Sequence, residues 1–305
     1  MTIDNANPKL FGLPAYCSRR LTQGTRMKKN ASPIKVLAVA LAVLSNIGRA
    51  QVPAPTEQPV ESLPTEQNIF GEKTDVTIGA GATYAARYPG ATSRQLVPNP
   101  VLSLQRGILF ADTLRGIGVQ YQSASEFYVA QSFFYDLGRL DKNNSWRPGS
   151  NRLVGMGDVP GSVTAHTLIA QTFTALLLVS AEIEMALRDT ARRNRYRLGI
   201  EFTPLKNASD TVTIDLDGWW GDGRYNQAWF GVTPQQAART GFAAFSPGAG
   251  VYQLVPGVSW EHHLDRHWSS TLQLTGTRYV ATVSDSPILA QRTSTSATAA
   301  IAYTY

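Results

Sequence analysis

Charged side chains recur at alternating positions along three consecutive segments in the second half of this 305-residue chain. They are Glu182, Glu184, Arg195, Arg197, Glu201, Asp215 and Asp217. Residues two apart on a β-strand point to the same side, so each segment places its charges on one face. Because both signs occur on neighbouring segments, we interpret the set as an ion-pair network. If the strands close into a barrel, this network fills its lumen. A path for charged solutes is the alternative, and segregated charges would favour it.

Three histidines and an aspartate near residue 265 carry the groups of a metal site: His262, His263, Asp265 and His267. Adjacent residues of a strand point to opposite faces, so His262 and His263 do not readily share one ion. His267 lies across a short turn. We therefore predict no metal site here and place these side chains at a membrane interface.

Ser162, His166 and Asp158 carry the side chain types of a hydrolase triad. They lie close together along one segment, and such neighbours do not converge in the geometry that a triad needs. We therefore predict no catalytic residues, and we find no pattern that calls for a cofactor.

Five aromatic residues cluster at the end of one segment and in the stretch that follows it: Trp219, Trp220, Tyr225, Trp229 and Phe230. A girdle at the membrane interface accounts for Trp219, the first of them. A surface that contacts another protein is the alternative for the cluster.

The last residues of the chain alternate strictly between apolar and small or polar types. The apolar positions are Ala297, Ala299, Ile301, Tyr303 and Tyr305. This period of two predicts a strand that ends on an aromatic residue, as the closing strand of an outer-membrane barrel does. We expect the barrel-insertion machinery to read these five positions. An edge strand of a soluble protein is the alternative.

An export signal begins at Met27 rather than at the first residue. A basic start is followed by the apolar run Val36–Leu44 and by a small-x-small cleavage pattern that ends at Ala50. The run is shorter than the roughly 20 residues that a membrane-spanning helix needs. We interpret residues 1–26 as a non-native upstream extension and residues 27–50 as the signal peptide. A longer signal peptide is the alternative.

The net charge of +6 comes mainly from the segment that we expect to be removed. Eight of the 28 basic residues and one of the 22 acidic residues precede Gln51, which leaves 20 and 21. We therefore exclude nucleic-acid binding. The single cysteine, Cys17, also lies upstream, so we expect no disulfide.

Residues 51–73 are rich in proline and glutamate, and we predict a linker in the periplasm. Residues 74–305 form eleven segments with strand-like alternation, among them Ile108–Gln122 as one strand, and residues 221–248 read as a loop. Bacterial barrels have even strand numbers, so we predict an all-β, antiparallel transmembrane outer-membrane β-barrel of 10–12 strands. A soluble sandwich has the same alternation; the export signal and the terminal aromatic strand favour the barrel.

Several short motifs after residue 221 occur together in one order. Their main positions are Tyr225, Phe230, Gly231, Val232, Asp285, Ser286 and Pro287. With the final aromatic strand, this order resembles the MipA/OmpV family, whose members interact with the murein hydrolase MltA. The resemblance covers residues 74–305, and the proline-rich linker departs from the family pattern.

The resemblance implies an outer-membrane barrel without catalytic residues. It implies a scaffold that links a lytic transglycosylase to a bifunctional penicillin-binding protein in cell-wall assembly, or a surface antigen or adhesin. A small-solute channel is a second hypothesis, drawn from the polar face. A lipid-modifying enzyme is a third, and it would need His166, or Glu182 and Glu184, at the lipid boundary. Outer-membrane lipid and lipopolysaccharide are the expected surroundings.

Overall fold

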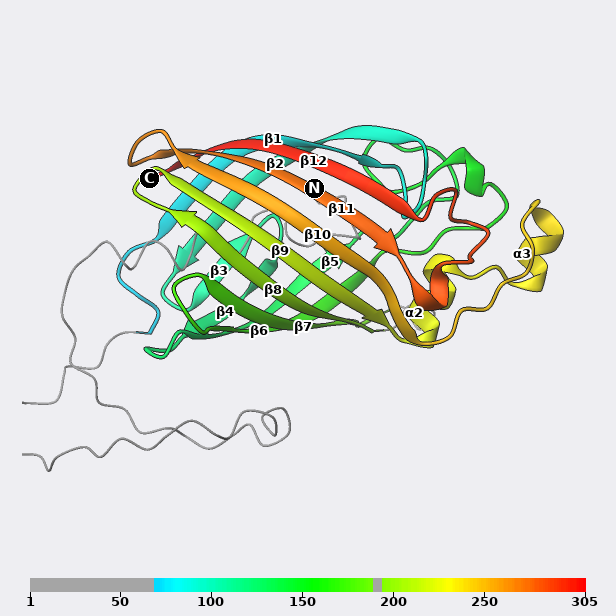
Figure 1. The fold of residues 1–305 in the computed structure, drawn as a ribbon, viewed down its shortest axis with the longest axis horizontal. Coiled ribbons are helices and arrows are strands. Elements are labelled where there is room, and N and C mark those ends of the chain that lie inside the picture. Colours follow the sequence, from blue (N-terminus) through cyan, green and yellow to red (C-terminus); the bar gives the residue numbers. More distant parts are fainter. Residues whose placement is uncertain (1–68, 189–193) are drawn as a thin grey trace, which may run out of the picture. The chain divides into compact units, whose positions relative to one another are not determined.

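Twelve antiparallel strands form a closed barrel in the computed structural model, which describes residues 69–188 and 194–305 (Figure 1). The strands are β1 (Asp75–Ala86), β2 (Arg94–Arg106), β3 (Leu109–Asp112), β4 (Gly116–Gln122), β5 (Phe127–Asp136), β6 (Ser162–Thr172), β7 (Leu177–Ala186), β8 (Arg195–Lys206), β9 (Asp210–Gly221), β10 (Gly250–His263), β11 (Trp268–Tyr279) and β12 (Thr293–Thr304). Each strand pairs with its neighbours in the chain, and β12 closes the barrel against β1. The predicted fold class is confirmed.

The predicted single strand Ile108–Gln122 is wrong, because these residues form the hairpin of β3 and β4. Asp112 makes the turn: its Oδ1 accepts hydrogen bonds from the backbone nitrogens of Leu114 at 2.9 Å and Arg115 at 2.5 Å. Gly116 then adopts a φ of 81°, which costs glycine little. This extra hairpin accounts for the difference between the eleven predicted segments and the twelve observed strands.

Short turns gather at one end of the barrel and long connections at the other (Figure 1). Residues 123–126, 173–176, 207–209 and 264–267 make short turns at the end that holds the C-terminus. The opposite end carries residues 137–161, 222–249 and 280–292, with the short 3-10 helices η2 (Asn151–Leu153) and η3 (Ala281–Val283). Outer-membrane barrels keep short turns in the periplasm and long loops outside. Tyr305 therefore lies at the periplasmic end.

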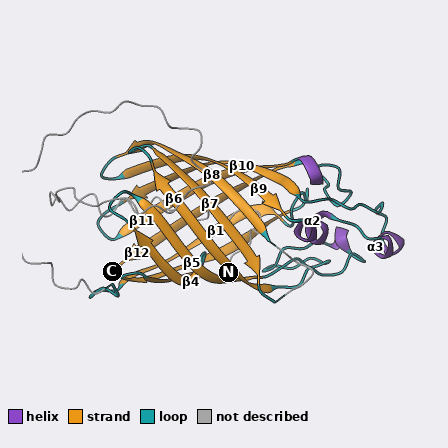
Figure 2. Cartoon of the chain, turned by 90° about the horizontal axis from the view of Figure 1, so that it is seen from below, coloured by secondary structure: helices purple, strands orange, loops and turns teal. Residues whose placement is uncertain are grey.

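Two short helices lie in the segment 221–248, which the sequence analysis treated as a loop: α2 (Gly223–Phe230) and α3 (Pro234–Arg239) (Figure 2). Asp222 caps α2 by accepting a hydrogen bond from the Tyr225 nitrogen at 2.7 Å. Thr233 and Gln236 form a capping box on α3. These cap residues were a signal for helices, but each helix is too short to show a clear apolar period.

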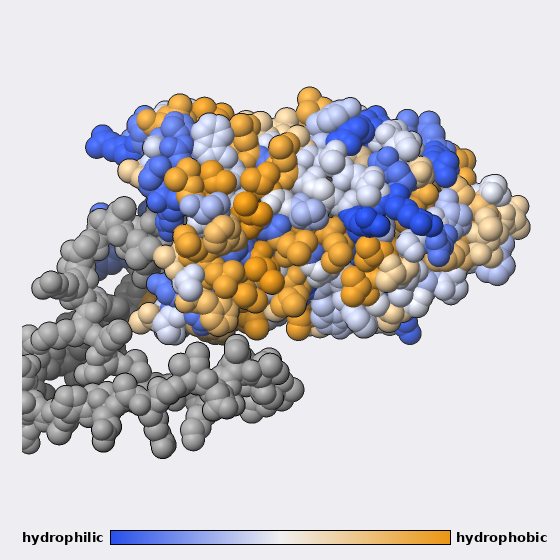
Figure 3. All heavy atoms as spheres, in the orientation of Figure 1, coloured by the Kyte–Doolittle hydropathy of each residue, from blue (hydrophilic) through white to orange (hydrophobic). Residues whose placement is uncertain are grey.

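The alternation along each strand places apolar side chains outside the barrel. On β8, for example, Leu198 and Ile200 are exposed while Arg195 and Arg197 are buried. Figure 3 shows hydrophobic side chains over the middle of the strands and hydrophilic ones toward both ends of the barrel. This apolar wall suits a barrel that crosses the outer membrane. Among the described residues, no helix is long and apolar enough to cross a membrane.

Candidate functional site

Arg197 is the centre of an ion-pair network inside the barrel. Its Nε donates to Glu182 Oε2 at 3.0 Å, and its Nη1 donates to Asp217 Oδ1 at 3.1 Å. Glu182 is the direct strand partner of Arg197 on β7, and Asp217 lies on β9. All three side chains are less than 10% exposed. The network therefore joins three neighbouring strands through charge-assisted hydrogen bonds in a region shielded from solvent.

Arg195 forms a second pair one step closer to the long-loop end. Its Nε donates to Glu184 Oε2 at 2.7 Å, and Glu184 is its direct strand partner. Its guanidinium lies 4.7 Å from the centre of the Trp219 ring, within the range of a cation–π contact. The network of charges thus continues into an aromatic cluster.

His166 joins the same network from β6. Its Nδ1 lies 2.9 Å from Glu182 Oε1, and its Nε2 lies 2.8 Å from Thr164 Oγ1. The Ser162 hydroxyl donates to the Val163 carbonyl instead of meeting the imidazole. His166 and its carboxylate partners therefore line the interior and do not lie at the lipid boundary, where a lipid-modifying enzyme would need them.

Two further carboxylates, Glu201 and Asp215, are direct strand partners on β8 and β9 and are 5% and 7% exposed. Glycines give these interior side chains room. A Cβ at Gly257 would lie 2.7 Å from Asp215 Oδ1, and one at Gly199 would clash with Asp217 and Arg197. The charged wall therefore depends on positions without side chains as well as on the charged residues.

The opposite part of the interior wall is polar but carries few charges. Thr83 on β1 and Thr298 on β12 share a hydrogen bond of 2.8 Å, and the Asn99 amide donates to Thr83 at 2.6 Å. Gln253 and Gln273 are buried on β10 and β11. The predicted charged residues thus lie together on β7–β9, and the interior faces of β1, β2 and β10–β12 carry mainly uncharged polar side chains.

Aromatic residues fill the long-loop end of the barrel. The buried cluster consists of Val159, Trp219, Tyr225, Trp229, Phe230, Tyr252, Val255, Tyr279 and Val283. The expectation that Trp219 lies in an interface girdle is wrong: it is 0% exposed, whereas the next residue, Trp220, faces outward and is 47% exposed. Consecutive strand residues point to opposite faces, so Trp219 lies on the interior face of β9 together with Asp215 and Asp217.

Hydrogen bonds to backbone carbonyls connect the long loops above this cluster. Ser286 Oγ donates to the Phe230 carbonyl at 2.5 Å, and Tyr88 Oη donates to the Ile288 carbonyl at 3.0 Å. Arg139 Nη1 donates to the Trp229 carbonyl at 2.6 Å. Burial lowers the pKa of Arg139 to about 10, so the guanidinium still carries its charge at neutral pH.

The long loops and the aromatic cluster beneath them together form a cap on this end of the barrel. The motif residues that carry the family resemblance lie in this cap. Tyr225, Phe230 and Val232 are each 2% exposed. Gly231 ends α2 where a Cβ would clash with the Gln227 side chain. The cap therefore gives these positions a packing role. Of the remaining motif residues, Ser286 bonds to Phe230, Asp285 pairs with Arg292 at 2.7 Å, and the Pro287 carbonyl accepts from Arg152 at 3.5 Å.

Several buried residues of the cap were not predicted from the sequence: Tyr88, Arg139, Leu153, Tyr252 and Tyr279. Arg139, Tyr88 and Leu153 lie in loops, where no periodicity marks a buried side chain. Tyr252 lies at a register shift of β10, between Val251 and Gln253, that turns two consecutive side chains inward. No local sequence pattern predicts such a bulge.

Aromatic rings gather at the periplasmic ends of β11 and β12. The His267 ring stacks on Tyr303 with ring centres 5.2 Å apart, and Tyr303 contacts Tyr305 at 4.8 Å. Ala297, Ala299, Ile301 and Tyr303 lie on the outward face of β12, and Tyr305 is 71% exposed.

The histidines of this end have separate partners. His262 Nδ1 lies 2.9 Å from Asp210 Oδ1, His263 points to the other face near Glu261, and His267 Nδ1 lies 2.8 Å from the Thr304 carbonyl. No group of metal-binding side chains occurs within residues 69–188 and 194–305. Backbone N–H groups of Trp268 and His267 lower the pKa of Asp265 in the turn.

Comparisons with solved structures find other outer-membrane barrels. An outer membrane channel from Pseudomonas putida F1 is 10% identical, with 79% of this chain and 100% of that chain covered and a TM-score of 0.41. The NanC porin is 8% identical, with 76% and 99% covered and a TM-score of 0.36. No curated protein matches the chain.

The predicted signal peptide, its cleavage residue Ala50 and most of the linker lie outside the described residues. The barrel itself coincides with a family match. The profile of the family described as "MltA-interacting protein MipA" matches residues 78–305, which covers the strands from β1 to the C-terminus and the loops with the motif residues. This outer-membrane barrel belongs to the MipA family.

Proposed function

We propose that the protein is a non-enzymatic scaffold that holds a lytic transglycosylase and a bifunctional penicillin-binding protein at the periplasmic face of the outer membrane. Membership of a family described as MltA-interacting carries this proposal. The interior supports it, because charged side chains on β7–β9 bond to one another and aromatic residues pack the long-loop end. A barrel whose interior is held by these contacts can serve as a rigid platform for partner proteins.

The periplasmic turns offer a surface for such partners. The turns 207–209 and 264–267 lie side by side, because the His263 nitrogen donates to the Ser209 carbonyl at 2.7 Å. Leu264 is 57% exposed at the tip of one turn, next to the exposed residues Asp265 and Arg266. An exposed aliphatic side chain with charged neighbours is a suitable anchor for a protein contact.

A pull-down with matched variants tests the scaffold. The folded barrel is immobilised, and a detergent extract of the same cells is passed over it at low and at moderate salt. We expect a lytic transglycosylase or a penicillin-binding protein to be retained at both salts by the wild type and lost with Leu264→Asp. Val154→Asp, which changes an equally exposed aliphatic residue in a long loop (60% exposed), keeps the partner.

One result would contradict the scaffold: the folded wild type retains no murein enzyme, with folding checked by heat-modifiable gel migration. Equal retention by both variants would remove only the turn as the contact. In that case deletion of residues 51–73 tests the proposed periplasmic linker, because the linker either supplies the contact or only spaces it.

A small-solute channel is the second candidate, and the uncharged polar part of the interior wall favours it. Polar side chains such as Thr83 and Gln273 are buried on the interior face away from the ion pairs of β7–β9. Hydrogen-bonding groups along a lumen suit the passage of small polar solutes. Conductance of the purified barrel in planar bilayers tests this function: steps that change with Arg197→Gln support it, and a silent bilayer excludes it.

A further inference from the structure

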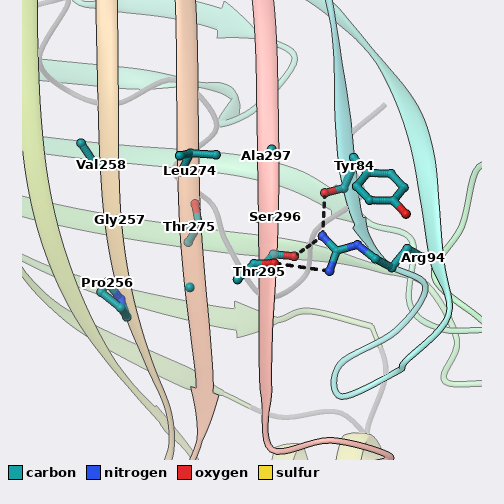
Figure 4. Close-up of a pocket in the computed structure, with 11 residues that line it drawn as sticks. Tyr84, Arg94, Pro256, Gly257, Val258, Leu274, Thr275, Thr295, Ser296 and Ala297 are labelled. Carbon is teal, nitrogen blue, oxygen red and sulfur yellow. Dashed lines mark hydrogen bonds between the residues drawn. The ribbon is translucent and has the colours of Figure 1, made fainter.

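A groove of about 740 Å³ crosses the outer wall of the barrel (Figure 4). It runs over β10, β11 and β12 to the outer end of β1, and Pro256, Val258, Leu274 and Ala297 supply much of its apolar lining. Its volume is in the range of about 300–1,000 Å³ that is typical of ligand pockets. Because it opens on the membrane-facing side, the groove is surrounded by lipid.

Small residues create the groove within an otherwise bulky apolar wall. Gly276 faces outward on β11 between Leu274 and Arg278, and a Cβ there would lie 3.4 Å from the Pro256 ring. On the neighbouring strand β12, the small residue Ala297 is the direct partner of Leu274. Toward the periplasmic end, the outward positions carry larger side chains, such as Leu272. The hollow is therefore confined to the half of the wall nearer the long loops.

One arginine, Arg94, lines the long-loop end of this hollow, and a second, Arg278, lies just beyond it on β11. Arg94 reaches from β2 across the β1–β12 junction, where its Nη2 donates to the Thr295 carbonyl at 2.5 Å and the Tyr84 carbonyl at 3.3 Å (Figure 4). Its Nη1 makes one long contact of 3.4 Å with Thr295 Oγ1. A guanidinium has five N–H donors, so Arg94 keeps donor capacity for an anion.

Arg278 adds a second positive charge beside the long-loop end of the groove. It is exposed and faces outward on β11, two residues beyond Gly276 and so nearer the membrane surface. Its side chain has no hydrogen-bond or ion-pair partner among the described residues. Arginines near the ends of membrane-spanning segments lie at headgroup depth, where they attract anionic lipid groups.

We propose that this groove binds a phosphorylated glycolipid of the outer leaflet, of the lipopolysaccharide type. One acyl chain lies along Leu274, Gly276 and Ala297, and a phosphate contacts Arg278 and Arg94. The long loops mark the external end, so the groove faces the outer leaflet. This inference goes beyond the scaffold and does not depend on it.

A second copy of the barrel fits the groove less well. Two copies in one membrane share their orientation, so a symmetric contact brings equal depths together. Arg94 and Arg278 of one copy would then face the same arginines of the other. Such like charges repel in a region of low dielectric, whereas a lipid phosphate neutralises them.

Native mass spectrometry of the folded protein, stripped of lipid and then offered defined lipids, tests the site. The probes are lipid A, lipid A without phosphates, and phosphatidylglycerol. We expect the wild type to retain lipid A in preference to the other two. Arg278→Gln removes a charge, and we expect it to weaken retention about fivefold, the effect of one arginine near a charged lipid surface. Gly276→Leu fills the groove, and we expect it to weaken retention as well. Gly276→Ala gives an intermediate loss.

Matched controls change the same residue types outside the groove. Gly218→Leu alters an outward glycine of β9, and Arg106→Gln alters an outward arginine at the periplasmic end of β2. Both should retain lipid A as the wild type does. Equal retention by every variant, equal retention of phosphatidylglycerol, or no retained lipid would each overturn the proposal. So would a dimer that Gly276→Leu dissociates, because it would assign the groove to a second copy.

Discussion

The Arg197 guanidinium lies 3.1 Å from the Asp217 carboxylate, inside a barrel that leaves Asp217 0% exposed. Arg197 also pairs with Glu182, so one cation serves two enclosed carboxylates on the two neighbouring strands. Shielding from water makes such pairs strong, but it also makes each charge costly once its partner is removed. A single substitution that removes one charge of the network should therefore have a large effect on the stability of the barrel.

Replacing Arg197 with methionine should destabilise the barrel by about 3–5 kcal/mol, because two buried carboxylates lose their cation. Urea unfolding of the detergent-folded protein, followed by tryptophan fluorescence, measures the loss. Arg292→Met is the control: that arginine pairs with Asp285 on the surface and is 65% exposed. We expect a change within about 0.5 kcal/mol for the control. Equal losses in the two variants would show that the interior pairs contribute nothing special.

Trp219 and Trp220 test which face of β9 packs the interior. Trp219→Ala should cost about 3–5 kcal/mol, because it leaves a cavity beside Tyr225 and Arg195. Trp220→Ala removes a ring that faces outward, so its loss should be clearly smaller. Thermal unfolding of both variants measures the difference. A larger loss for Trp220→Ala would contradict the observed orientation of the strand.

The turn at Asp265 should loosen in acid. The backbone N–H groups of Trp268 and His267 stabilise the carboxylate and lower its pKa below the ordinary 3.8. A carboxyl group whose pKa is lowered by folding adds stability above its unfolded pKa, and that stability is lost as the pH falls through the lower, folded value. Amide exchange of Trp268 should therefore accelerate as the pH falls below about 4, beyond the intrinsic pH effect. Asp265→Asn should abolish this pH dependence.

The final strand should direct assembly through its outward aromatic residues. Tyr305→Ser removes an aromatic ring that is 71% exposed and lies 4.8 Å from Tyr303. We expect less heat-modifiable, folded barrel in the outer-membrane fraction and more unfolded chain in the periplasm. Thr304→Ser is the control, because it keeps the inward hydroxyl that bonds to Thr77. Equal folded yields from both variants would remove Tyr305 from the insertion signal.

Much of the barrel wall was predictable because its physical basis is local. Alternation with a period of two assigns each side chain to one face within a few residues, so Leu198 and Ile200 could be separated from Arg195 and Arg197 without a structure. The hairpin at Asp112 was missed because its turn is short and the flanking residues continue the same alternation. The helices α2 and α3 were missed because six to eight residues give little periodic signal.

The sequence by itself determined the strand character of the wall, the face that each charged residue occupies, and the resemblance to the MipA family. Only the tertiary structure decided that Arg197 bonds to Glu182 and Asp217, that Trp219 joins the buried aromatic cluster, and that Ser286 donates to the Phe230 carbonyl. The groove beside Gly276 also belongs to this second group. The reason is that a face is set by a residue's own position in its strand, whereas a partner is set by the register and closure of strands far apart in the chain.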